Sequence, residues 1–249
     1  ATTITGAMLL LVLTVVRAPD VHIGWTAVTL AAGAALLAAF LAIERRSAAP
    51  LVRLALLRSG PLVRANIGAM ALTGSFFGFQ FVTVLYLQEL RDWSTVETGL
   101  TLMVMGIDAV LAPTLTPKLV ERWGNVRVIL GGFLLAAVGY ALFLPLGADW
   151  TYPMMLPTLI LTGLAFALAY GPLTIAATDG VDEAEQGVAG GLLNSSFQFG
   201  SALGLALVTA VNVAATEGGS ALDGYRAALV VPVAAALVGA AVMAVGLRR

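Results

Sequence analysis

The sequence predicts an all-α protein embedded in a membrane, with about eight transmembrane helices. Of the 249 residues, 59% are hydrophobic and 11% are charged, whereas soluble domains carry about 25% charged residues. Apolar runs of about 20 residues recur along the chain, and a helix of that length spans the hydrocarbon core of a bilayer, about 30 Å thick. No segment shows the alternating short strands of a membrane barrel, so helices must satisfy the backbone hydrogen bonds.

The first apolar run, residues 1–16, is short for a span, about 24 Å at 1.5 Å per residue. No initiator methionine precedes it, so we expect the chain to begin inside a helix and to be a fragment. A signal peptide is the alternative, although no basic region precedes the run. The next seven helices are expected near residues 24–43, 65–88, 94–115, 126–147, 153–172, 186–215 and 225–247.

Lysine and arginine predict the orientation, because they gather in the cytoplasmic loops of membrane proteins. Three arginines lie on one side of the predicted topology: Arg17, Arg91 and Arg226. The other ten basic residues lie on the opposite side, which we therefore assign to the cytoplasm: Arg45, Arg46, Arg53, Arg58, Arg64, Lys118, Arg122, Arg127, Arg248 and Arg249. An even number of helices then places both ends of this segment in the cytoplasm.

Three parts follow from these boundaries. Residues 1–43 form two linker helices, the first of them truncated, and residues 44–64 form a basic cytoplasmic linker. Residues 65–249 form a six-helix bundle, in which residues 65–147 and 153–247 are two sets of three helices. An odd number of helices per set inverts the second set, which is the arithmetic of inverted repeats in secondary transporters.

Glycine pairs at a spacing of four residues predict close packing of helices. The pairs are Gly74 with Gly78, Gly187 with Gly191, and Gly200 with Gly204. Such pairs also arise by chance in a sequence rich in small residues, so none of them is given a functional role.

Asp108 is the one carboxylate well inside a predicted span, with no basic residue nearby before Lys118. An ionised aspartate at mid-helix costs about 2.5 to 3.5 kcal/mol on insertion scales, so it is expected to face a cavity, a partner or a proton. We therefore regard Asp108 as a candidate for proton coupling. The alternative is a hydrated or paired carboxylate near the cytoplasmic end of its helix.

Two helices carry polar and aromatic residues on one face, which suits a pathway for an amphipathic solute. The alternative is hydrogen bonding between helices. The candidates for lining a substrate cavity are Asn66, Thr73, Phe77 and Gln80 in the first helix and Asn194, Gln198 and Ser201 in the second.

The stretch from Pro117 to Ile129 resembles the second copy of the cytoplasmic loop motif of the major facilitator superfamily, roughly G-x-L-a-D-R-x-G-R-R/K. Leu119, Arg122 and Gly124 match this pattern, and Glu121 replaces its aspartate; Pro117, Asn125 and Val126 depart from it. The resemblance implies a loop with a gating role for Glu121, Arg122, Gly124 and Arg127. Simple anchoring of the arginines on the cytoplasmic side is the alternative.

Further stretches resemble the fourteen-helix drug:proton antiporter branch of that superfamily: Glu44–Arg46 with Pro50–Val52, Arg64–Asn66, Tyr86–Gln88, Thr98–Leu100 and Gly187–Gly204. The resemblance implies the C-terminal six-helix half of this fold with two linker helices, and an N-terminal six-helix half that is missing. No residue in the pattern of this family corresponds to Asp108.

These features together predict a secondary transporter of the bacterial inner membrane that exports amphipathic or cationic organic compounds in exchange for protons. Membrane lipids, the missing half, the solute and protons are its expected partners; no basic patch points to nucleic acid. Without cysteine and with His22 as the sole histidine, neither a metal site nor a cofactor is expected, and no G-x-x-x-x-G-K loop for ATP occurs. The rivals are a facilitator or symporter of another solute, a non-transporting helical module, and a membrane enzyme, which no catalytic cluster supports.

Overall fold

The computed structural model describes residues 5–7, 9–10, 13–14, 23–46 and 59–247. These residues form α-helices with short 3₁₀ and π segments, and no strand occurs among them. Most of the predicted first helix, His22 and residues 47–58 of the predicted basic linker lie outside this part of the chain. The predicted all-α fold is confirmed for the described residues.

In the described part of the chain, six helical segments are long and apolar enough to cross a membrane. Each overlaps the span predicted for it, and most of the ends differ from the predicted ones by a few residues. The helix α2 (Ile23–Arg46) precedes them. The six are α3 (Gly60–Leu85) with η2 (Tyr86–Leu90); α4 (Thr95–Leu102) with η3 (Met103–Ile107) and α5 (Asp108–Thr114); α7 (Asn125–Phe143); α8 (Tyr152–Thr178); α9 (Glu183–Thr216); and α10 (Ala221–Ala228) with α11 (Val230–Gly246). The short helix α6 (Thr116–Trp123) links α5 to α7.

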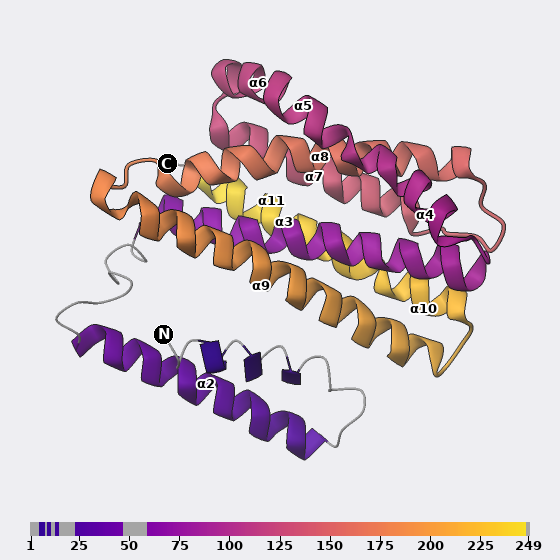
Figure 1. The fold of residues 1–249 in the computed structure, drawn as a ribbon, viewed down its shortest axis with the longest axis horizontal. Coiled ribbons are helices and arrows are strands. Elements are labelled where there is room, and N and C mark those ends of the chain that lie inside the picture. Colours follow the sequence, from indigo (N-terminus) through magenta and orange to yellow (C-terminus); the bar gives the residue numbers. More distant parts are fainter. Residues whose placement is uncertain (1–4, 8, 11–12, 15–22, 47–58, 248–249) are drawn as a thin grey trace.

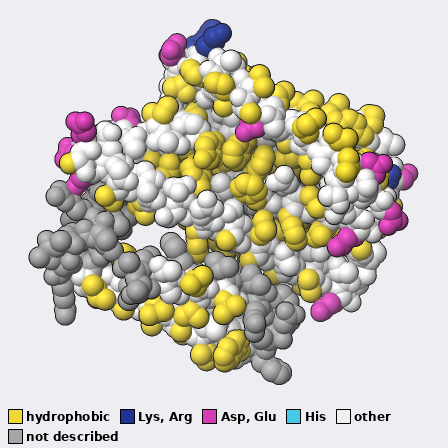
Figure 2. Space-filling model, viewed as in Figure 1, with side chains coloured by type: hydrophobic (Ala, Val, Ile, Leu, Met, Phe, Trp, Pro, Cys, Tyr) yellow, Lys and Arg dark blue, Asp and Glu magenta, His cyan; other side chains and the backbone are white. Residues whose placement is uncertain are grey.

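The helix α3 lies at the centre of the six-helix bundle (Figure 1). It packs against α8, α9 and α11, while α7 packs against α8 and α11. Aromatic side chains fill much of the core: Phe79 lies 5.0 Å from Tyr140 and 5.2 Å from Phe143 between ring centroids. On the surface, hydrophobic side chains cover much of the middle of the molecule, and most Asp and Glu lie toward its two ends (Figure 2). This distribution suits a bundle that spans a membrane.

Glycines set the crossing of α3 and α9. A Cβ on Gly200 or Gly204 would collide with the backbone of Met70 or Gly74, and a Cβ on Gly74 would stand 2.9 Å from the carbonyl oxygen of Gly200. The two backbones therefore approach as closely as glycine allows, and the close packing predicted at Gly74 with Gly78 and at Gly200 with Gly204 is confirmed. In the remaining predicted pair, Gly187 and Gly191 both have nothing within 4 Å of their Cβ positions.

The α7–α8 connection is held by three side chains from other elements. The carbonyls of residues 146, 147 and 148 accept hydrogen bonds from Arg226 Nε, Tyr86 Oη and Arg91, each at 2.8 Å. At the opposite end of the bundle, a Cβ on Gly246 would stand 3.1 Å from Arg64 Nε. The first of the six helices therefore begins on the side of the bundle where the last one ends.

Candidate functional site

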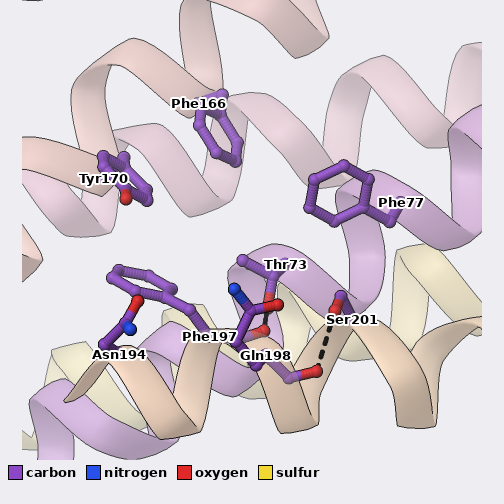
Figure 3. Close-up of a pocket in the computed structure, with 8 residues that line it drawn as sticks. All are labelled: Thr73, Phe77, Phe166, Tyr170, Asn194, Phe197, Gln198 and Ser201. Carbon is purple, nitrogen blue, oxygen red and sulfur yellow. Dashed lines mark hydrogen bonds between the residues drawn. The ribbon is translucent and has the colours of Figure 1, made fainter. Parts of the chain in front are cut away.

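A pocket of about 290 Å³ lies between α3, α8 and α9, and neutral side chains form its entire lining (Figure 3). The lining residues are Thr73, Phe77, Phe166, Tyr170, Asn194, Phe197, Gln198 and Ser201. A second hollow adjoins it, because Phe77, Gln198 and Ser201 line both, together with Ala202 and Leu205. The two hollows share one wall along α9, whose spacing of three and four residues places these side chains on one face.

Aromatic rings form a ladder along the pocket. The ring of Phe166 stacks on Tyr170 at 5.2 Å between centroids, and Tyr170 stacks on Phe197 at 4.7 Å. Phe76 joins the ladder to Phe77, at 4.5 Å from Phe166 and 5.5 Å from Phe77. Tyr170 is 43% exposed and Phe77 is 38% exposed. The exposed parts of Tyr170 and Phe77 are therefore available to a flat apolar or cationic group.

Polar groups stand opposite the rings. The Oγ1 atom of Thr73 donates across the helix crossing to the carbonyl of Phe197, at 2.6 Å. The Oγ atom of Ser201 bonds to the carbonyl of Gln198, one turn earlier on α9. The exposed amides of Asn194 and Gln198 make no hydrogen bond to any other residue that the structure describes. Both amides can therefore donate to and accept from a solute.

Five of the residues expected to line a substrate cavity meet at this pocket: Thr73, Phe77, Asn194, Gln198 and Ser201. Two do not. Asn66 accepts a hydrogen bond from Ser196 Oγ at 2.7 Å and donates to the carbonyl of Leu62 at 2.8 Å. This contact between α3 and α9 is hydrogen bonding between helices, which was the predicted alternative to lining a solute pathway. Gln80 is partly buried and lines neither hollow.

Phe166 and Tyr170 of α8 are lining residues that the sequence analysis missed. The helix α8 contains almost no polar side chain in its middle, so no polar stripe marked one of its faces. The available signal was a pair of aromatic residues four positions apart, which places both rings on one face of a helix.

Asp108 lies outside both hollows, at the start of α5 and directly after the 3₁₀ segment η3. It is partly exposed and makes no hydrogen bond or ion pair with the described residues. Gly163 of α8 lies directly against the carbonyl oxygen of Met105 in η3. A mid-helix 3₁₀ segment often marks a hinge or a strained position, and here it immediately precedes the carboxylate.

The predicted cytoplasmic loop forms the sharp connection between α6 and α7. Gly124 has φ of +82°, which glycine adopts without strain. Glu121, Arg122 and Arg127 are exposed, and the guanidinium of Arg122 lies 6.0 Å from the ring centroid of Trp123. Asn125, a departure from the family pattern, donates to the carbonyl of Pro172 at 2.9 Å and so attaches the turn to α8.

Comparison with known proteins identifies relatives across most of this chain. A family model described as Major Facilitator Superfamily matches residues 2–205. The lincomycin resistance protein of Streptomyces lincolnensis is 34% identical over 77% of this chain and 40% of its own length. The tetracenomycin C resistance and export protein of Streptomyces glaucescens is 32% identical over 82% of this chain and 38% of its own.

A third relative matches nearly the whole chain. The drug efflux pump JefA of Mycobacterium tuberculosis is 29% identical over 95% of this chain and 47% of its own length. The chain therefore spans less than half the length of each of these relatives.

Proposed function

Because the chain belongs to the Major Facilitator Superfamily, we propose that it is the C-terminal part of a multidrug exporter. Its relatives carry the names of antibiotic resistance and drug efflux proteins, and both the family and these names point to a transporter rather than an enzyme. The observation that carries the proposal is the pocket between α3, α8 and α9, where aromatic rings face free amides.

The lining chemistry supports amphipathic and cationic organic substrates. An organic body gains apolar contact with the rings of Phe166, Tyr170 and Phe197. A positive charge is attracted to the faces of exposed rings, and amide carbonyls such as that of Gln198 accept hydrogen bonds from it. Since every lining side chain is neutral, a single fixed charge does not restrict the choice of substrate.

Alternating access would expose this pocket to the two sides of the membrane in turn. In transporters of this architecture, one helical bundle rocks against another around a site near the midplane. The second and fifth spans of the bundle present most of their surface outward, with only 17% and 22% of their apolar windows buried. We propose that a preceding six-helix half covers these helices and completes the pocket, and that residues 121–127 form the cytoplasmic gating loop.

Proton coupling is assigned to Asp108 in this proposal. Its carboxylate is partly exposed, without a partner in the described chain, and lies within a span. A carboxylate in such a place is a candidate for taking up and releasing a proton. Exchange of that proton against the solute would couple export to the pH gradient.

The test is efflux of a cationic dye from proteoliposomes that hold the complete transporter, with and without a pH gradient. We expect gradient-driven efflux in the native protein, its loss in Asp108→Asn, and no change in Asp179→Asn, a matched variant in the exposed α8–α9 turn. If gradient-driven efflux survives Asp108→Asn, another residue must couple efflux to the pH gradient. Efflux indifferent to the gradient would favour a facilitator, and no dye movement would contradict export.

A further inference from the structure

The face of the α3–α9 crossing that lies away from the pocket carries an apolar groove of about 280 Å³. Three helices, α3, α9 and α11, form it. Its lining consists only of apolar side chains and glycine: Ile67, Met70, Ala71, Gly74, Gly200, Leu203, Gly204, Leu207, Val231, Ala235 and Val238. Ile67, Leu207 and Val238 are 39%, 41% and 53% exposed, so the groove is open to the surroundings of the bundle.

Neither water nor a polar solute suits this groove. Its walls offer no hydroxyl, amide or charged side chain, and a polar group there would lose its hydrogen bonds to water without replacement. A saturated chain requires only apolar contact, which these walls supply through van der Waals packing. In a bilayer, the molecule that supplies such chains is a phospholipid.

A basic side chain lies at one end of the groove. Arg64 precedes Ile67 by three residues, so the two lie on neighbouring positions of the same side of α3. The Nε atom of Arg64 lies over Gly246, at the end of α11, and Arg64 forms no ion pair with a described carboxylate. Its charge is therefore available to an anion.

The distance along α3 from Arg64 to the last lining residue, Gly74, matches one leaflet. From Arg64 to Gly74, ten residues of helix span about 15 Å, which is half of the hydrocarbon thickness of about 30 Å. A lipid whose phosphate lies at Arg64 would therefore extend its acyl chain past Ile67 to Gly74, near the middle of the membrane. The Arg64 side is the one that the basic loops assign to the cytoplasm.

We propose that this groove binds an anionic phospholipid of the cytoplasmic leaflet, with its phosphate on Arg64 and one acyl chain between α3, α9 and α11. Basic positions between transmembrane helices on the cytoplasmic side are suited to anionic headgroups. The site lies on the other face of the helix crossing from the solute pocket and does not depend on what the protein transports.

Native mass spectrometry of the purified full-length protein tests the site, with phosphatidylglycerol and phosphatidylcholine of identical acyl chains as probes. We expect one phosphatidylglycerol to be retained about fivefold more than phosphatidylcholine, the factor that a single basic residue gives near the surface. Arg64→Gln should abolish this preference, whereas Lys118→Gln, at an exposed position of α6, should retain it. A preference that survives Arg64→Gln would overturn the headgroup assignment.

The acyl chain is tested separately. Ala235→Phe places a ring in the groove and should reduce retention of both lipids, whereas Ala234→Phe, exposed outside the groove on the same helix, should not. Unchanged retention in Ala235→Phe would overturn the chain assignment. A photoreactive side chain at position 235 should crosslink to lipid; a crosslink to residues 1–46 instead would show that the N-terminal helices fill the groove and would refute the proposal.

Discussion

The two faces of the α3–α9 crossing differ in chemistry although the same two helices build both. One face carries hydroxyls, amides and aromatic rings around the pocket, and the other carries only aliphatic side chains and glycine. The glycine contact between the helices separates them. A helix pair that must stand between a solute and lipid needs this asymmetry, because each neighbour requires a different surface.

The glycine contact is the feature whose loss should have the largest effect. In Gly204→Ala, the new Cβ would collide with the backbone of Gly74, and the helices must separate at a cost of about 1 to 3 kcal/mol. Gly191→Ala is the matched control, since nothing lies within 4 Å of that Cβ and alanine favours helix over glycine by about 0.5 to 1 kcal/mol. Thermal unfolding in detergent should show a lower midpoint for the first variant only.

The same comparison has a functional outcome. If Gly204→Ala separates the helices, dye binding in the pocket and lipid retention in the groove should both weaken, because both surfaces include residues of the crossing. A variant that is destabilised yet retains both would show that the crossing does not support the two surfaces together.

The aromatic ladder should give the next largest effect. Tyr170→Ala removes the ring between Phe166 and Phe197. This change should weaken the binding of an aromatic dye about 2- to 13-fold, since an aromatic pair contributes about 0.5 to 1.5 kcal/mol. Tyr152→Ala is the matched control, at the start of the same helix with a similar exposed fraction, 37% against 43%. Equilibrium dye binding by the purified transporter measures both.

Retention of affinity in Tyr170→Phe would identify the ring, rather than the hydroxyl, as the binding group. Equal losses in Tyr170→Ala and Tyr152→Ala would contradict a specific role for the ladder and would leave the pocket without its main apolar surface.

The sequence predicted the helices and the α9 wall of the pocket, but it did not predict the α8 wall. The spans follow from apolar length, which a single chain reveals directly. The polar face of α9 could also be recognised from the single chain, because Asn194, Gln198 and Ser201 stand out among apolar neighbours. The α8 wall was not, because Phe166 and Tyr170 resemble core residues until the fold places them beside Phe197.

The sequence also did not reveal which neighbouring residues each side chain contacts in the folded bundle. Asn66 and Thr73 share a face of α3, yet Asn66 bonds to Ser196 while Thr73 lines the pocket. Similarly, the glycine pairs of α9 have the same spacing, but only Gly200 and Gly204 meet another backbone. Spacing along one helix therefore predicts a shared face, whereas the neighbouring helix decides what that face contacts.

The bond between Ser196 and Asn66 should give the smallest effect. Ser196→Ala removes a donor at 2.7 Å from Asn66 Oδ1, and a hydrogen bond of this kind contributes about 0.5 to 1.5 kcal/mol. Ser195→Ala is the matched control, because the Oγ atom of Ser195 bonds only within its own helix, to Gly191. The midpoint of thermal unfolding should fall in Ser196→Ala and stay near the native value in Ser195→Ala, with dye affinity retained in Ser196→Ala because Ser196 does not line the pocket. Loss of dye affinity without loss of stability would instead return Asn66 to the solute pathway and extend the polar face of the crossing toward the start of α3.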